Sequence, residues 1–209
     1  MASQAEIDHL IKRFPELAGP DVLFEKEVYA HFGLLCFHFG LFEHSLINAV
    51  TFSEAIAAAK KARVRTQAQW EPIFDREFHK ATKQTFGNLI RQAKSIPEFS
   101  ELKRQFDELK ELRDYFIHHF WRRETRFMSS EQGCWQLLVE MNRVREKFES
   151  ADRSTHEMHE ALLRRMGFPS LSPEQIEVNI KSIQEDAQTE IAEGAFLHGI
   201  DRWRTPEQD

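Results

Sequence analysis

One stretch of the chain carries an apolar stripe with the spacing of an α-helix. Its members recur at intervals of three or four residues: Phe99, Leu102, Phe106, Leu109, Leu112, Phe116 and Phe120. Side chains at this spacing share one face of a helix with 3.6 residues per turn, and such a face packs against other elements. The stripe therefore predicts a long amphipathic helix, which begins at Pro97 because proline is favoured in the first turn.

The rest of the chain also favours long helices. Eight Gly and seven Pro among 209 residues leave few tight turns, and no run of alternating β-branched residues demands a sheet. Periodicity predicts further helices over about 22–62, 67–94 and 131–166, and the cap sequence Ser172-Pro173-Glu174-Gln175 predicts one more. We expect an all-α fold: a helical bundle of about five or six helices over residues 1–166, with a long C-terminal helical extension, a helix and tail, over 167–209.

Net charge, cysteine content and hydropathy limit the kinds of protein that this chain can be. A net charge of −6 argues against a broad nucleic-acid-binding surface, but it allows a small basic cleft. Cys36 and Cys134 lack metal-site spacing, which favours a reducing compartment. The first residues lack the basic start and apolar run of a signal peptide, and the apolar stretch 32–42 is short and contains His38. These features predict a cytoplasmic protein with no membrane span.

The predicted helix from Pro97 carries an arginine on its apolar side and two histidines farther along. Arg113 falls within about 40° of the centre of the stripe, so it should face neighbouring helices. A buried guanidinium needs partners, and Glu43 in the 22–62 helix is the predicted carboxylate. His118 comes about 140° further round, and His119 follows it directly. A purely structural ion pair with surface histidines is the alternative interpretation.

Three arginines and a tryptophan follow the histidines. Arg122, Arg123 and Arg126 are candidates for contacts to phosphates. Trp121 lies off the apolar stripe and is a candidate for stacking on a base or for contact with a second subunit. If these residues bind RNA, they form a local basic site on an acidic protein.

The segment 112–122, Leu-Arg-Asp-Tyr-Phe-Ile-His-His-Phe-Trp-Arg, resembles the signature of HEPN domains, in which an Arg precedes a His on one helix. The segment 85–90, Thr-Phe-Gly-Asn-Leu-Ile, is similar to an element of some bacterial proteins of that group. The apolar helix that ends in Phe42-Glu43-His44 is similar to the helix that lends the family a polar residue. The resemblance covers about residues 21–150. Asp114 stands where the family most often has Asn.

The resemblance implies a function for these residues. Family members with this motif are usually metal-independent endoribonucleases that act as homodimers, with two Arg/His sets lining a groove at the subunit interface. It implies catalytic roles for Arg113 and His118, supporting roles for Asp114, His119 and Glu43, and a place in a toxin–antitoxin or phage-defence system. An antitoxin or regulatory protein is then a further partner, and no metal or other cofactor is expected.

A second function remains open at this point. A non-catalytic helical module of the same fold could bind a partner protein or a nucleotide. Asp114 and the acidic net charge favour it, because both oppose the approach of RNA phosphates.

Overall fold

The described residues of the computed structural model are 12, 25–167 and 172–192, and no strand occurs among them. The predicted all-α class is confirmed. The helices in chain order are α2 (Glu25–Ala62), α3 (Gln67–Thr82), α4 (Phe86–Ala93), the 3-10 helix η2 (Pro97–Leu102), α5 (Lys103–His118), α6 (Phe120–Glu124), the 3-10 helix η3 (Thr125–Ser129), α7 (Glu131–Arg165) and α8 (Pro173–Ala192). The chain divides into two compact units, Met1–Leu162 and Leu163–Asp209.

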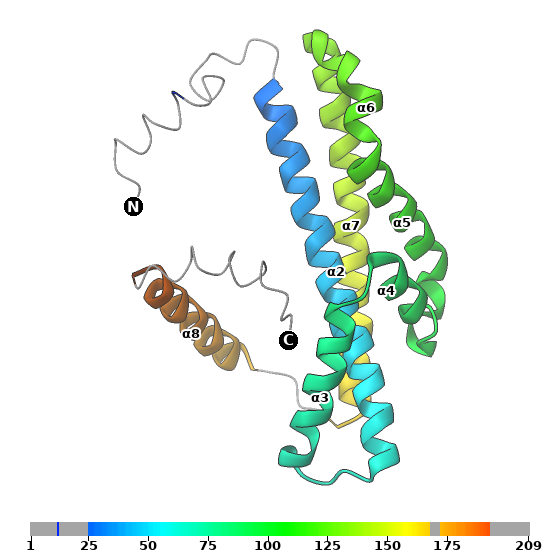
Figure 1. The fold of residues 1–209 in the computed structure, drawn as a ribbon, viewed down its shortest axis with the longest axis vertical. Coiled ribbons are helices and arrows are strands. Elements are labelled where there is room, and N and C mark those ends of the chain that lie inside the picture. The colour runs from blue at the N-terminus through cyan, green and yellow to red at the C-terminus, as the bar shows by residue number, and fades with distance from the viewer. Residues whose placement is uncertain (1–11, 13–24, 168–171, 193–209) are drawn as a thin grey trace, which may run out of the picture. The chain divides into compact units, whose positions relative to one another are not determined.

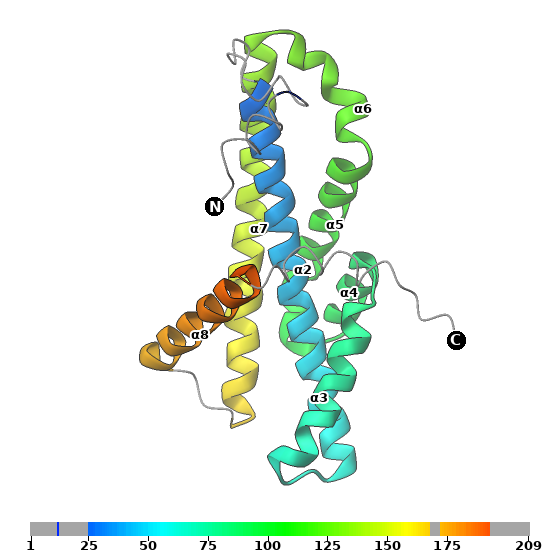
Figure 2. The same ribbon diagram turned by 60° about the vertical axis from the view of Figure 1, so that its left-hand side comes forward.

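The two longest helices of the first unit, α2 and α7, run side by side in the same direction (Figures 1 and 2). Polar contacts link the middle parts of the two helices. The imidazole of His38 lies 3.3 Å from the carboxylate of Glu149, and the hydroxyl of Ser45 donates to Asp152 at 2.5 Å. The histidine of the apolar 32–42 stretch therefore has a polar partner on the neighbouring helix.

Aromatic side chains from three helices meet in the core. The ring of Phe42 on α2 lies 5.8 Å from that of Phe106 on α5 and 5.6 Å from that of Phe148 on α7. All three side chains are fully buried. The predicted stripe lines this core: every member is buried except Leu112, which packs against its edge. The amphipathic pattern thus identified the core face of α5 correctly.

The predicted 67–94 helix is two helices. Helix α3 ends at Thr82, and α4 begins at Phe86 after Thr85. The Thr85 hydroxyl accepts a hydrogen bond from the backbone N–H of Asn88 at 3.3 Å. A threonine N-cap satisfies a donor that a new helix leaves free, so this local bond stabilises the start of α4.

The helix that carries the Arg/His motif also ends earlier than predicted. Helix α5 stops at His118, His119 has φ −126° and ψ −27°, and α6 begins at Phe120. No proline or glycine lies near this break, so the sequence did not predict it. The rings of Phe116 and Phe120 still stack across it, with centroids 4.8 Å apart, so the break keeps both in the core.

The last described helix begins as predicted. The backbone N–H of Ser172 donates to the Gln175 side chain at 2.8 Å, and the N–H of Gln175 donates to the Ser172 hydroxyl at 3.3 Å. These reciprocal bonds are a capping box. For α7 the capping residue is Ser130, whose hydroxyl accepts from the N–H of Gly133 at 3.2 Å.

Gly133 holds the start of α7 against η3, and its replacement by alanine should destabilise the protein. A Cβ at this position would lie 1.9 Å from the carbonyl oxygen of Phe127. Because that neighbour is backbone, relief requires movement of η3, and we expect a loss of about 1–3 kcal/mol in the free energy of unfolding. Urea denaturation of the Gly133→Ala variant measures this. The exposed neighbour Gln132 supplies the control, because Gln132→Ala should change the free energy of unfolding by less than about 0.5 kcal/mol. Equal losses of stability in the two variants would contradict the steric explanation.

Helix α2 also meets a simple criterion for a membrane span. Its most apolar window of 18 residues has a mean hydropathy of 1.2, and one third of that window is buried in the bundle. The central helix of a soluble bundle meets the same criterion, so length and composition do not distinguish the two. Several apolar side chains of α2 stay exposed outside the core.

Candidate functional site

Arg113 is half-buried on α5 and has its partners close by. Its guanidinium carbon lies 5.4 Å from the centre of the Phe86 ring on α4, and its Nη1 lies 3.4 Å from a carboxylate oxygen of Asp114. The expected orientation toward neighbouring helices is therefore found. The expected ion pair with Glu43 is wrong, because Asp114 is already within reach and the Phe86 ring covers a face of the guanidinium.

Asp114 is shared between two cations. Its second carboxylate oxygen accepts a hydrogen bond from Lys110 at 2.8 Å. Partial burial raises the pKa of Asp114, but the bonds to Lys110 and Arg113 and their charges outweigh it and lower that pKa below its usual value. The carboxylate is thus held ionised, and it offsets part of the charge that Arg113 presents.

Arg113 also approaches α2 at Cys36. Burial raises the pKa of the Cys36 thiol, and the positive charge of Arg113 partly opposes this. Cys36 packs against the edge of the core. Cys36 lies one helical turn from Gly33 and Gly40, which are on the side of α2 that faces away from the core, so the charge of Arg113 acts close to that side.

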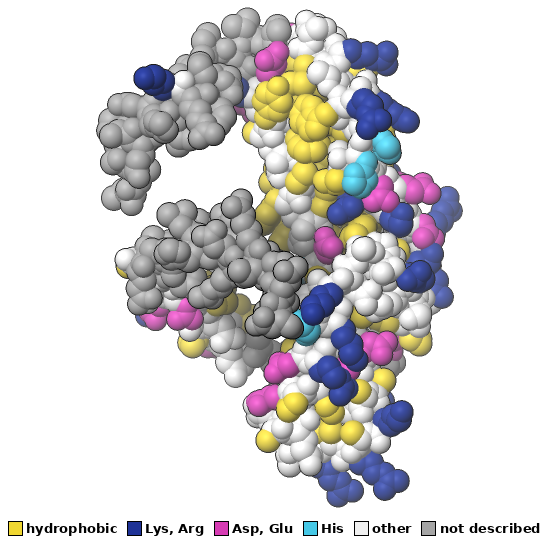
Figure 3. All heavy atoms as spheres, in the orientation of Figure 1, with side chains coloured by type: hydrophobic (Ala, Val, Ile, Leu, Met, Phe, Trp, Pro, Cys, Tyr) yellow, Lys and Arg dark blue, Asp and Glu magenta, His cyan; other side chains and the backbone are white. Residues whose placement is uncertain are grey.

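That side of α2 is apolar and is left exposed by the described part of the chain, and we call it the outer face of α2. It consists of Ala30, Gly33, Leu34, Phe37, Gly40 and Leu41, all exposed. Phe37 is 59% exposed and Leu34 42%. Figure 3 shows hydrophobic side chains gathered over the amino-terminal half of α2, beside histidine and basic side chains on the α5–α6 side. A continuous apolar patch of this kind on a soluble protein is typical of an interaction surface.

His118 and His119 are both exposed at the end of α5. Their ring centroids lie 6.3 Å apart, and neither imidazole forms a hydrogen bond or ion pair with a described residue. Both are therefore open to a ligand. On one helix Arg113 and His118 lie about 140° and about 7.5 Å apart, so a single chain does not bring the two side chains to one face.

The predicted RNA-binding residues divide into two groups. Arg122, Arg123 and Arg126 are exposed, as a role in phosphate binding requires. Trp121 is instead half-buried, and its ring packs 5.5 Å from that of Tyr29 and 4.8 Å from that of Phe32, both on α2. Packing against α2 accounts for Trp121 without RNA.

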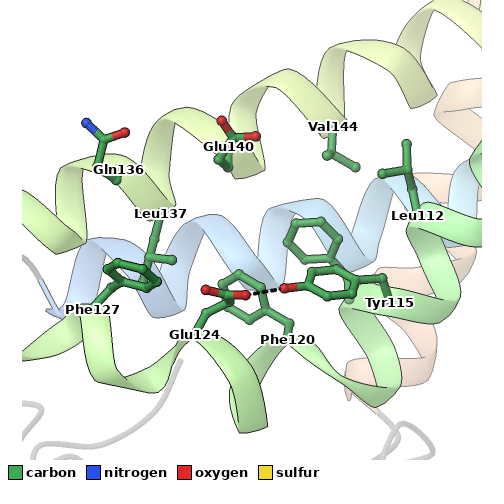
Figure 4. Close-up of a pocket in the computed structure, with 10 residues that line it drawn as sticks. Leu112, Tyr115, Phe120, Glu124, Phe127, Gln136, Leu137, Glu140 and Val144 are labelled. Atoms are coloured by element: carbon green, nitrogen blue, oxygen red, sulfur yellow. Dashed lines mark hydrogen bonds between the residues drawn. The ribbon is translucent and has the colours of Figure 1, made fainter.

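A pocket of about 420 Å³ opens between α5, α6 and η3 on one side and α7 on the other (Figure 4). Its lining is mostly apolar and aromatic: Leu112, Tyr115, Phe116, Phe120, Glu124, Phe127, Gln136, Leu137, Glu140 and Val144. Inside it the Tyr115 hydroxyl donates to the Glu124 carboxylate. Burial and this bond to Glu124 raise the pKa of Tyr115 to about 12, against a smaller opposing effect of Arg123.

Sequence reasoning missed this pocket for a geometric reason. Residues nine apart on a straight helix lie on opposite sides and about 13.5 Å apart along the axis. Tyr115 and Glu124 therefore meet only because the helix breaks at His119. Nothing in the local sequence signalled that break.

Comparison with protein-family models, with curated proteins and with solved structures finds no match to this chain. Among the described residues no group of three His, Cys, Asp or Glu side chains is arranged to hold a metal ion.

Proposed function

We propose that this chain is a HEPN-type endoribonuclease that cleaves RNA without a metal ion. The observation that carries the proposal is the pair of accessible histidines at the end of α5, with exposed arginines on α6 next to them. Imidazole is the side chain that exchanges protons at neutral pH, and arginine is the side chain that binds phosphate in two places at once. These two groups together can support phosphodiester transfer without a metal ion.

The proposed reaction is an attack of the ribose 2′-oxygen on the adjacent phosphorus. The P–O5′ bond breaks, the 2′-hydroxyl proton leaves, and the 5′-oxygen gains a proton. His118 removes the first proton or supplies the second. Arg113 stabilises the additional charge on the phosphoryl oxygens in the transition state, while Arg122, Arg123 and Arg126 bind neighbouring phosphates. The products are a 2′,3′-cyclic phosphate and a 5′-hydroxyl.

The proposal requires two copies of the chain. One chain holds Arg113 and His118 on different sides of α5, so the site must be completed across an interface. The outer face of α2 is the surface that favours this, because it is apolar and exposed and lies one helical turn from Cys36, on which the charge of Arg113 acts. A homodimer packed over this face would bury Leu34, Phe37 and Leu41 and bring two basic edges together.

A cytoplasmic location and a role in a toxin–antitoxin or phage-defence system belong to the same proposal. A ribonuclease that attacks cellular RNA needs control, so an antitoxin or regulatory protein would be its second partner. An exposed active site at the end of a helix is a surface that such a protein could cover.

The decisive experiment incubates the purified full-length chain with single-stranded RNA in excess EDTA. We expect cleavage, with 2′,3′-cyclic phosphate ends identified by mass spectrometry. Phe37→Asp places a charge on the proposed interface, and it should reduce both the dimer fraction in light scattering and the cleavage rate. Intact RNA after prolonged incubation with the dimeric wild-type chain, or full activity in a monomeric variant, would count against the proposal.

One observation favours the second candidate function, a non-catalytic helical module. Asp114 and Arg113 form an ion pair, which offsets charge that a phosphate would need. A dimeric chain that cleaves no RNA but retains a specific partner would support this module.

A further inference from the structure

The pocket between α5, α6, η3 and α7 has two chemically different parts. Four aromatic side chains, Tyr115, Phe116, Phe120 and Phe127, line it, and they offer flat apolar surface. Hydrogen-bond acceptors, the carboxylates of Glu124 and Glu140, lie among them. A ligand that fits this lining is a flat ring with N–H groups on its edge.

Glu124 is the carboxylate that can accept further hydrogen bonds. Its Oε1 accepts from the Tyr115 hydroxyl, and its Oε2 accepts no hydrogen bond from a described residue. Glu140 differs, because the guanidinium of Arg143 binds it at 2.6 Å. An ionised carboxylate accepts two parallel N–H bonds and repels ring nitrogens that are acceptors. The pocket therefore favours a ring that presents two adjacent donors to Glu124.

Two arginines stand next to the aromatic lining. The guanidinium carbon of Arg123 lies 5.9 Å from the centre of the Tyr115 ring, and that of Arg126 lies 4.8 Å from the centre of the Phe127 ring. Both arginines are exposed. Positive charge at this margin disfavours an organic cation and favours a ligand whose ring is joined to an anion.

We propose that this pocket binds the guanine base of a nucleotide, with Glu124 reading the base and Arg123 and Arg126 holding its phosphate. Among the four RNA bases, guanine alone places two adjacent N–H donors, N1–H and N2–H, on its Watson–Crick edge. Adenine and cytosine pair one amino donor with an acceptor nitrogen, and uracil flanks its single N–H with two carbonyl oxygens. Glu124 accordingly selects guanine, while stacking on the aromatic rings supplies sequence-independent affinity.

The test is calorimetric titration of the full-length chain with GMP, guanosine, AMP and UMP. We expect GMP to bind about tenfold more tightly than AMP or UMP, and Glu124→Gln to remove that preference, because one acceptor oxygen becomes an N–H₂ donor. Glu111→Gln, an exposed change on α5, is the matched control and should leave all affinities unchanged. Arg123→Ala with Arg126→Ala should weaken GMP and not guanosine.

A second variant guards against loss of folding in Glu124→Gln, which also removes a partner of Tyr115. Phe127→Ala keeps the carboxylate and should lower the affinity for all three nucleotides about tenfold by removing a stacking surface. Thermal unfolding monitors both variants. Equal affinities for GMP, AMP and UMP, no binding of any of them, or a Glu124→Gln chain that still prefers GMP would overturn the assignment.

Binding of guanine in an RNA strand, as opposed to a free nucleotide, rests on the proposed ribonuclease function, and the two can fail separately. A short single-stranded RNA with one guanosine should compete with GMP if RNA is the source; failure to compete identifies the free nucleotide. A chain that binds GMP but leaves RNA intact keeps this pocket and loses the ribonuclease. A chain that cleaves RNA but binds GMP, AMP and UMP equally or not at all keeps the ribonuclease and loses this pocket.

Discussion

The His118→Ala variant should lose RNA cleavage by a factor of about 10²–10⁴ while it unfolds at the same temperature as the wild-type chain. The loss is expected because an alanine cannot transfer the proton of the 2′-hydroxyl or of the leaving 5′-oxygen. The unchanged stability is expected because the imidazole is exposed and forms no hydrogen bond or ion pair with a described residue. The measurement is the single-turnover cleavage rate in EDTA.

The neighbouring histidine supplies the matched control. His119 is also exposed, but it lies at the helix break and its backbone has left helical geometry. His119→Ala should retain most of the rate if His118 is the working group. Equal losses in both variants would assign the reaction to the pair, and unimpaired cleavage by His118→Ala would end the present assignment of that residue.

Phe106→Ala should produce the largest loss of stability, about 3–5 kcal/mol in the free energy of unfolding. The Phe106 ring is fully buried and contacts the rings of Phe42 and Phe99, with centroids 5.8 Å and 6.0 Å away. Truncation to alanine removes apolar contacts from α5 and leaves a cavity at the junction of α2, η2 and α5. The free energy of unfolding of a domain is only about 5–15 kcal/mol, so this variant would lose a large fraction of its stability.

Ile117→Ala tests whether this loss reflects burial, since Ile117 lies on the same helix but is 41% exposed. We expect a change of less than about 1 kcal/mol at that position. Chemical denaturation followed by circular dichroism compares the two. Similar losses at Phe106 and Ile117 would contradict the assignment of the core to the Phe99–Phe120 stripe.

Local periodicity determined a large part of the fold. The stripe from Phe99 to Phe120 identified the buried face of α5, and Ser172-Pro173 identified the start of α8, because these features depend on residues within one or two helical turns. Helix ends were predicted less well. Thr85 acts as an N-cap through a single side-chain bond, which helical periodicity on both sides had concealed.

The candidate site shows the same division. Arg113, His118 and the following arginines were chosen as candidates from the sequence alone. The prediction that Arg113 faces a neighbouring helix is confirmed. The predicted carboxylate partner is wrong, since an ion pair depends on which acid lies nearest in space, and Asp114 is nearer than Glu43. Trp121, the candidate for contact with RNA or a second subunit, is half-buried and packs on Tyr29 and Phe32, and that contact stays a prediction.

The sequence by itself determined that this chain is all-α and that one helix carries an arginine and a histidine pair, because side-chain period and residue type are local properties. Only the tertiary structure decided that the helix breaks at His119 and that Tyr115 reaches Glu124 across the break. It also decided that the described part of the chain leaves an apolar face of α2 exposed. The physical reason is that breaks, pockets and uncovered faces depend on how helices pack against each other, and residues far apart in the chain determine that packing.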